Sequence, residues 1–228
     1  MNAGSGVWAV LVAAGKGERF GGDRPKAFAN LGGRPLLAES LSRLESSDWI
    51  EALVVVAPPE WEEPSILLAE ELGAGKVRAS VAGGETRTDS VRAGLAEVDE
   101  EAVVVLVHDA ARPFVPEEVV ERVIAAVGDG WDGAVPALPL ADTVKRAEGD
   151  AVAETVDRTG LYAVQTPQAF LAGSLRPALD GARSATDCAG LVEAAGGRVR
   201  LVEGDRRLLK VTTPADLAFV EALLGAET

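Results

Sequence analysis

The chain has 228 residues, 47% of them hydrophobic, which suffices for the buried core of one α/β domain spanning residues 1–228. Its formal net charge of -14 disfavours nonspecific binding to nucleic acid or to anionic membranes. We expect a cytoplasmic protein, because no apolar run approaches the roughly 18 residues of a membrane span and no signal pattern opens the chain. A single cysteine, Cys188, and a single histidine, His108, exclude an internal disulfide and a Cys/His zinc site.

The first predicted element is a strand that leads into a glycine-rich loop. The apolar, valine-rich run 7–14 predicts a central parallel strand that stops at Gly15. Glycines in this loop let the backbone approach a ligand and turn its N–H groups toward it; they are residues 15, 17, 21 and 22. Arg19 and Lys26 would add positive charge, so we expect this loop to bind a polyphosphate.

Two well-known phosphate-binding loops do not fit this stretch. A Walker A loop needs Gly-Lys-Ser/Thr, but Gly17 follows Gly15 and Lys16 here. A dinucleotide fingerprint needs a third glycine or an alanine where this chain has Phe20. The remaining alternative to a polyphosphate site is a surface turn that is merely basic.

Strands and helices alternate along the rest of the chain. Apolar runs predict strands at 51–57, 76–81, 102–107, 133–136 and 198–203. Helical spacing and capping residues predict helices at 34–44, 60–72, 86–95, 116–127, 186–195 and from Pro214 onward, with Thr213 as N-cap. Strand, turn and helix in succession are typical of a doubly wound sheet, so we expect a Rossmann-like α/β domain with a mostly parallel central sheet.

The strongest predicted strand, 102–107, runs directly into His108 and Asp109. Ligands of open α/β sheets bind at the carboxyl ends of the strands, which makes Asp109 a candidate for binding a divalent cation or a sugar hydroxyl. The alternative for Asp109 is a cap on the following turn. We interpret His108 as a structural, hydrogen-bonded residue rather than a catalytic base.

The segment 138–162 departs from the strand–helix pattern. Alternating residues at 142–147 and 152–158 flank a Gly-Asp turn, which predicts a β-hairpin. A hairpin this polar has little core of its own, so we expect it to project as an arm and pack against a second copy of the protein. Residues 163–168 then return to the sheet.

Seven stretches together point to one known family: 13–26, 83–95, 107–113, 142–145, 165–168, 186–187 and 210–214. In this order they resemble the 2-C-methyl-D-erythritol 4-phosphate cytidylyltransferases over nearly the whole chain. The resemblance implies a nucleotide-diphospho-sugar-transferase fold and a homodimer whose hairpin arms cross between subunits. It also implies Mg²⁺-dependent transfer of a cytidylyl group from CTP to methylerythritol phosphate, with release of pyrophosphate, in non-mevalonate isoprenoid precursor synthesis.

The resemblance further implies roles for single residues. Arg19 and Lys26 would stabilise the transition state, while Arg158 and Lys210 would position the methylerythritol phosphate. The residues expected to bind the substrates are Ala13, Ala14, Gly15, Gly17, Gly84, Arg87, Ser90, Asp109, Ala110, Arg112, Thr143, Thr166 and Thr186, of which Gly84, Arg87 and Ser90 line the cytosine pocket. Asp109 is also the candidate metal ligand. The chain departs from the family pattern at Ala27, often Gln, and at Leu208, often Asn.

This chemistry needs no general base, because the nucleophile is an ionised phosphate monoester that attacks the α-phosphorus of the nucleotide. Catalysis then rests on positioning two anions and neutralising charge on the five-coordinate phosphorus. Three alternatives stay open: a cytidylyltransferase for another polyol phosphate such as ribitol 5-phosphate, a sugar-1-phosphate nucleotidyltransferase that uses UTP or GTP, and a non-catalytic nucleotide-binding regulator.

Overall fold

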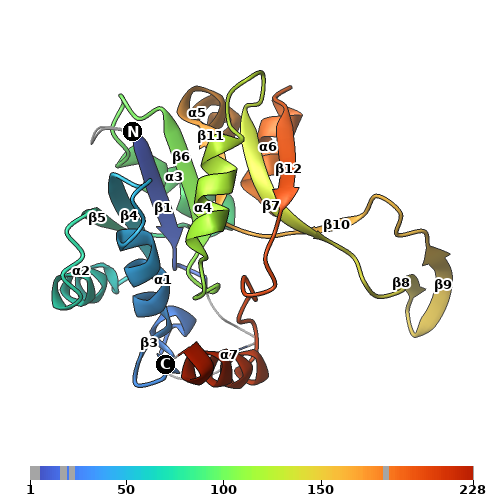
Figure 1. The fold of residues 1–228 in the computed structure, drawn as a ribbon, viewed down its shortest axis with the longest axis horizontal. Helices are drawn as coiled ribbons and strands as arrows, with labels where there is room; N and C mark the ends of the chain where they lie inside the picture. The colour runs from blue at the N-terminus through green and yellow to red at the C-terminus, as the bar shows by residue number, and fades with distance from the viewer. Residues whose placement is uncertain (1–5, 16–19, 21–23, 182–184, 228) are drawn as a thin grey trace.

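The computed structural model describes residues 6–15, 20, 24–181 and 185–227 (Figure 1). At its centre lies an eight-stranded sheet with the order β7-β11-β6-β1-β4-β5, in which β10 and β12 also pair with β7. The strands are β1 (Val7–Val12), β4 (Ala52–Ala57), β5 (Val77–Ala82), β6 (Val104–Asp109), β7 (Gly133–Pro139), β10 (Tyr162–Val164), β11 (Gln168–Leu171) and β12 (Val199–Glu203). Most neighbours run parallel, which confirms the predicted α/β class, but β10 and β11 run antiparallel to their partners.

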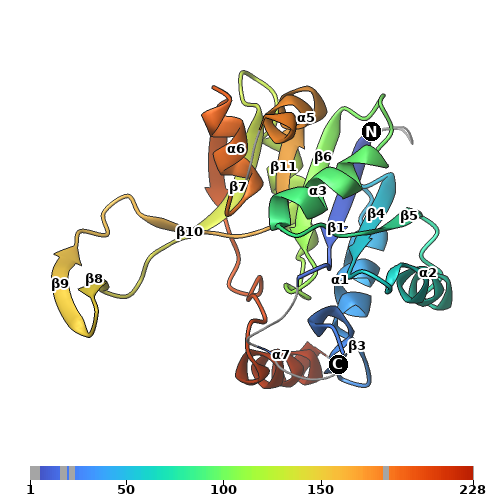
Figure 2. The ribbon, with the colours of Figure 1, turned by 180° about the vertical axis from the view of Figure 1, so that it is seen from behind.

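Helices cover both faces of this sheet. One face carries α1 (Leu36–Glu45) and α4 (Glu117–Ala125), and the other carries α3 (Arg87–Ala96), α5 (Ala172–Asp180) and α6 (Cys188–Ala194) (Figures 1 and 2). A further helix, α2 (Glu62–Glu71), contacts β4 and β5. Successive residues of a strand point to opposite faces, so Leu11 packs in one core cluster and Val10 in the other. Burial on both faces explains why the strands are continuous apolar runs.

The carboxyl ends of the parallel strands meet at one edge of the sheet. There β6 ends at Asp109, and the segment that follows β12 crosses back toward it. Below this edge lies α7 (Pro214–Glu227), close to the two short strands β2 (Asn30–Leu31) and β3 (Arg34–Pro35) (Figure 1). Val220 of this helix packs on Leu36 and Phe114 in a third apolar cluster. The cluster fixes the chain around residue 211 against the rest of the edge.

The arm predicted at 138–162 is a separate hairpin that extends away from the body (Figures 1 and 2). Its strands, β8 (Val144–Glu148) and β9 (Ala151–Val156), pair only with each other among the described strands. Between residues 141 and 164 only Val144 and Val156 are even half-buried. The hairpin prediction is confirmed, and the residues of the hairpin form no buried core of their own.

The structure also differs from the predictions in several places. Helix α1 begins at Leu36 rather than residue 34, because the two preceding residues form β3, and a 3₁₀ turn (η1, Lys26–Phe28) precedes it. Helix α5 was not predicted, since Gly173 and Pro177 within it are helix breakers by propensity. Burial of its leucines compensates for them. No described helix is long and apolar enough to cross a membrane.

Candidate active site

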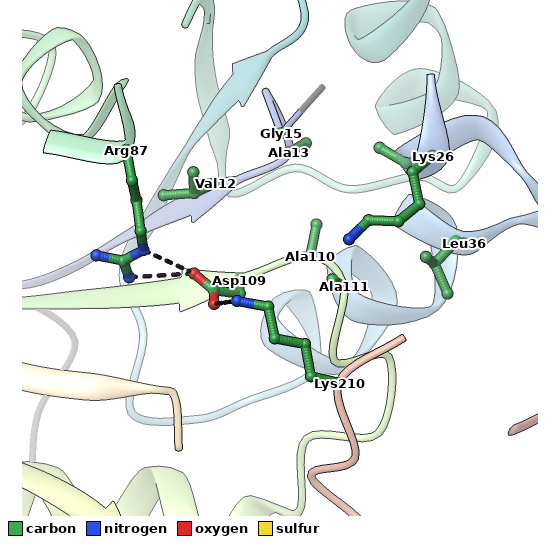
Figure 3. Close-up of a pocket in the computed structure, with 11 residues that line it drawn as sticks. Val12, Ala13, Gly15, Lys26, Leu36, Arg87, Asp109, Ala110, Ala111 and Lys210 are labelled. Atoms are coloured by element: carbon green, nitrogen blue, oxygen red, sulfur yellow. Dashed lines mark hydrogen bonds and ion pairs between the residues drawn. The ribbon is translucent and has the colours of Figure 1, made fainter. Parts of the chain in front are cut away.

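Two adjoining pockets lie at the carboxyl edge of the sheet and share Arg87, Asp109 and Lys210. The first pocket, drawn in Figure 3, is also lined by Val12, Ala13, Gly15, Lys26, Ala27, Leu36, Ala110 and Ala111. The second is also lined by Arg112, Val164, Gln165, Thr166, Gln168, Thr186 and Asp187. They hold about 530 and 500 Å³ of empty space, part of which is open to solvent.

Asp109 lies between two cations at the junction of these pockets (Figure 3). Arg87 donates to its Oδ1 from Nε and Nη2, at 3.2 and 3.1 Å, and Lys210 Nζ donates to its Oδ2 at 2.7 Å. Burial alone would raise the pKa of Asp109, but the charges of Arg87 and Lys210 outweigh it and lower the pKa below its ordinary value. The carboxylate is therefore ionised and holds two positive groups at the centre of the site.

His108 is connected to the backbone of Asp109 through the hydroxyl of Thr166. Its Nε2 lies 3.0 Å from the carbonyl oxygen of Arg112, which can only accept, so Nε2 carries the proton. Its Nδ1 then accepts from the hydroxyl of Thr166, and that hydroxyl also accepts from the backbone N–H of Asp109. Burial lowers the pKa of His108 to about 4, so the ring is neutral at neutral pH. The prediction that His108 is a hydrogen-bonded residue is confirmed.

Lys26 extends its ammonium into the first pocket (Figure 3). Its Nζ donates to the carbonyl oxygen of Val211, 3.0 Å away, and thus lies near the segment that carries Lys210. Gly17 and Arg19, also predicted for this site, lie outside the described residues. The described part of the loop nevertheless ends at the first pocket, because Ala13 and Gly15 line it.

The turn before α3 lies against the end of β1. A Cβ at Gly83 would lie 2.1 Å from the Cβ of Ala14, so only glycine allows this approach. Ser90 is buried, accepts from the N–H of Gly84 and donates to the carbonyl oxygen of Thr86. These contacts fix the turn that precedes Arg87, although neither Gly84 nor Ser90 lines the two pockets.

Other polar residues of the second pocket were not assigned a role by the sequence analysis. Gln168 is buried, and its Nε2 donates to Asp187 Oδ2 at 3.1 Å. Asp187 caps α6 by accepting from the N–H of Gly190. Thr186, which was predicted, is exposed at the rim of the same pocket. Arg112, which was also predicted, lines the pocket and donates to the carbonyl oxygen of Leu208.

The predicted residues of the arm lie apart from these pockets. Arg158 donates from Nη1 to the carbonyl oxygens of Leu140, at 2.8 Å, and Ala141, which closes the base of the arm. Thr143 is exposed on the same arm. Neither residue lines either pocket. Of the predicted residues that the structure describes, those that line the two pockets are Ala13, Gly15, Lys26, Arg87, Asp109, Ala110, Arg112, Thr166, Thr186 and Lys210. Ala14, Gly84, Ser90 and the arm residues Thr143 and Arg158 do not line them.

The expected magnesium ion needs oxygen ligands, such as those of carboxylates and phosphates. The described residues contain no group of three or more His, Cys, Asp and Glu side chains that would enclose a metal. Asp109 is the one carboxylate among the described lining residues of the first pocket. Mg²⁺ is commonly bound by one or two carboxylates together with the phosphates of a ligand, and a site with Asp109 alone fits that pattern.

Comparisons with known proteins point to one family. The family model of 2-C-methyl-D-erythritol 4-phosphate cytidylyltransferase matches residues 7–226. The enzyme of that name from Frankia casuarinae is 48% identical over 221 residues, which cover 96% of this chain and 81% of the relative. The one from Rubrobacter xylanophilus is 43% identical over 227 residues, covering 97% and 96%.

Solved structures give the same result. A crystal structure of 4-diphosphocytidyl-2C-methyl-D-erythritol synthase superposes with a TM-score of 0.82 at 36% identity and covers 96% of this chain and 98% of its own. The 2-C-methyl-D-erythritol 4-phosphate cytidylyltransferase from Thermus thermophilus superposes with a TM-score of 0.78 at 38% identity, covering 95% and 98%.

Proposed function

This chain belongs to the 2-C-methyl-D-erythritol 4-phosphate cytidylyltransferase family, and we propose that its two adjoining pockets bring the two substrates of that reaction together. The enzyme transfers a cytidylyl group from CTP to 2-C-methyl-D-erythritol 4-phosphate. The products are 4-diphosphocytidyl-2-C-methyl-D-erythritol and pyrophosphate. The reaction belongs to non-mevalonate isoprenoid precursor synthesis.

We assign the first pocket to CTP and the second to methylerythritol phosphate. The observation that carries this assignment is the way the expected residues divide between the pockets. Ala13, Gly15 and Lys26, which belong to the segment around the loop expected to bind a polyphosphate, line the first pocket only, whereas Arg112, Thr166 and Thr186, also expected to bind a substrate, line the second only. The two groups of residues meet at the shared charges, where the new phosphate bond would form.

The proposed chemistry is an in-line attack by a phosphate oxygen of methylerythritol phosphate on the α-phosphorus of CTP. The attacking oxygen is already ionised, so no base is required, and neutral, buried His108 fits that requirement. Lys26, with Arg19 from the same loop, neutralises charge that builds on the phosphorus. The side chain of Lys210 is 40% exposed, so its ammonium can contact the phosphate of the acceptor from its place beside Asp109.

Three further features complete the proposal. Asp109 would hold a magnesium ion together with the phosphates of CTP, and the ion would neutralise their charge. The arm, which has no core in its own subunit, would pack against a second copy and bring Arg158 and Thr143 to the partner's acceptor pocket. The enzyme would act in the cytoplasm as a homodimer.

Pyrophosphate release tests the assignment of substrates. Purified enzyme would receive CTP, UTP, GTP or ATP, each with methylerythritol phosphate or ribitol 5-phosphate. We expect efficient release only with CTP and methylerythritol phosphate. Faster release with ribitol 5-phosphate would overturn the acceptor, preference for another nucleotide would overturn the donor, and no release with any pair would favour a nucleotide-binding regulator.

A further inference from the structure

Gln165 forms a two-point contact with the backbone of Asp205. Its Nε2 donates to the carbonyl oxygen of Asp205 at 2.8 Å, and its Oε1 accepts from the N–H of the same residue at 3.0 Å. The glutamine is buried, with only 7% of the residue exposed. A primary amide is suited to this task, since it offers a donor and an acceptor side by side without charge.

The neighbouring backbone is built for this contact. A Cβ at Gly204 would lie 2.3 Å from Gln165 Oε1 and 3.1 Å from the backbone of Ala137. Glycine at this position therefore lets the chain approach the amide. Gly204 also donates its N–H to the carbonyl oxygen of Ala137, so the contact begins where β12 leaves the sheet.

The contact fixes the start of the segment that carries Lys210. From Asp205 this segment crosses from β12 to the junction of the two pockets, where Lys210 reaches Asp109. Two further anchors come from the loop after β6: Arg112 donates to the carbonyl oxygen of Leu208, and the N–H of Val211 donates to that of Ala111. Gln165 connects the segment to the opposite wall of the second pocket. Gln165 itself lines that pocket.

Gln165 and Thr166 are neighbours in the chain, and each holds the backbone of one side of the Lys210–Asp109 pair. Thr166 accepts from the backbone N–H of Asp109, while Gln165 holds the segment of Lys210. We propose that Gln165 is a positioning residue, which holds the Lys210 segment so that the ammonium lies where the phosphate of the acceptor binds. This inference rests on the assignment of the second pocket to methylerythritol phosphate.

The test is the substitution Gln165→Leu, which keeps the bulk of the side chain and removes both hydrogen bonds. Because two neutral hydrogen bonds are lost, KM for methylerythritol phosphate should rise roughly five- to tenfold. KM for CTP and kcat should stay within about twofold. A second variant, Gly204→Ala, should give the same pattern by forcing the backbone away from the amide, and it serves if Gln165→Leu does not fold.

Two comparisons make the test specific. In the Lys210→Ala background, Gln165→Leu should cause no further rise in KM for the acceptor, because its effect passes through Lys210. As a matched control, Arg122→Ala removes the hydrogen bond to the carbonyl oxygen of Glu203, two residues before Asp205, and should leave both KM values unchanged.

The outcomes separate this inference from the function on which it rests. If Lys210→Ala raises KM for the acceptor but Gln165→Leu and Gly204→Ala do not, the role of Gln165 is wrong and the pocket assignment stands. An equal rise in both KM values with a lower Tm would make Gln165 merely structural. An unchanged acceptor KM in Lys210→Ala would instead refute the proposed role of Lys210.

Discussion

Lys210 and Asp109 lie 101 residues apart in the sequence, yet the Nζ of Lys210 is 2.7 Å from Oδ2 of Asp109. The second oxygen of that carboxylate is bound by Arg87, which comes from a third part of the chain. One buried carboxylate thus assembles two cations in a protein whose net charge is -14. Phosphorylated substrates repel each other and an acidic surface, so in the proposed function this local assembly would allow them to meet.

Replacing Asp109 by Asn should separate these cations and lower both activity and stability. At neutral pH we expect a loss of about 1–3 kcal/mol in the free energy of unfolding, typical of a charged hydrogen-bonded group. The pKa of Asp109 in the folded state is below its ordinary value of 3.8, so the stabilisation is complete above about pH 4 and is lost as the pH falls further.

Urea denaturation of the wild type and Asp109→Asn between pH 3 and 8 measures this difference. The gap in unfolding free energy should be constant from pH 5 to 8 and shrink below pH 4. A gap that widened toward acid would contradict the direction of the pKa shift.

Lys26→Ala should reduce kcat by roughly 10²- to 10³-fold, the loss typical of one electrostatic group at the transition state. Lys76→Ala is the matched control, because Lys76 lies outside both pockets and donates to the carbonyl oxygen of Ser47. Steady-state pyrophosphate release from both variants gives the comparison. Near-normal turnover of Lys26→Ala would remove this residue from the mechanism.

Gly83→Ala should weaken binding of CTP, because the new methyl group would force the turn before α3 away from Ala14. We expect KM for CTP to rise at least about tenfold, the cost of an overpacked contact. Gly173→Ala adds the same methyl group in α5, where nothing lies within 4 Å, and should keep normal kinetics. Equal KM values in the two variants would show that the turn does not shape the nucleotide pocket.

His108, the single histidine of the chain, gives a direct test of the base-free chemistry. Its pKa is lowered to about 4 by burial, so NMR of its ring in the folded enzyme should show the neutral form from pH 8 to about 5. The unfolded chain binds a proton near pH 6.5, so the contribution of His108 to stability is complete above that pH and is lost toward pH 4.

The pH dependence of kcat/KM should therefore show no step that coincides with a titration of His108. A step near pH 6 is expected from the substrate phosphates, whose second pKa is about 6. A His108 titration in that range that coincided with a change in rate would assign the ring a role in proton transfer.

Mixed dimers test whether the arm completes the partner's site. Arg19→Ala and Arg158→Ala should each be nearly inactive, and mixing them should restore up to about a quarter of wild-type activity, because half of the subunits enter mixed dimers and each mixed dimer holds one intact site. Mixing Arg19→Ala with Lys26→Ala should restore none if both residues serve the same subunit's pocket. Failure of the first mixture, with subunit exchange shown by mass spectrometry, would argue against shared sites.

The sequence predicted the body of the fold well because parallel strands buried on both faces are unbroken apolar runs. It did not predict that β11 runs antiparallel, since the pattern of a strand carries no direction. Helix α5 was missed because burial of Leu175 and Leu179 outweighs the helix-breaking tendencies of Gly173 and Pro177.

The charged residues of the site were predicted from motifs and resemblance, but their supports were not. Gln165 contacts the backbone of Asp205, and backbone partners leave no trace in residue identities. Leu208, where the family often has Asn, has a buried side chain. Its contribution to the site is its carbonyl oxygen, which accepts a hydrogen bond from Arg112. Only the fold shows that the Lys210 segment is held through its main chain.

The reversed direction of β11 has a consequence for how this enzyme family can change. Its beginning, rather than its end, faces the catalytic edge, and the preceding parallel strand β7 ends at that same edge. Everything inserted between these strands must therefore emerge beside the reacting groups. Lengthening or shortening the hairpin therefore changes how far the chain extends from this edge while the eight-stranded sheet keeps its register.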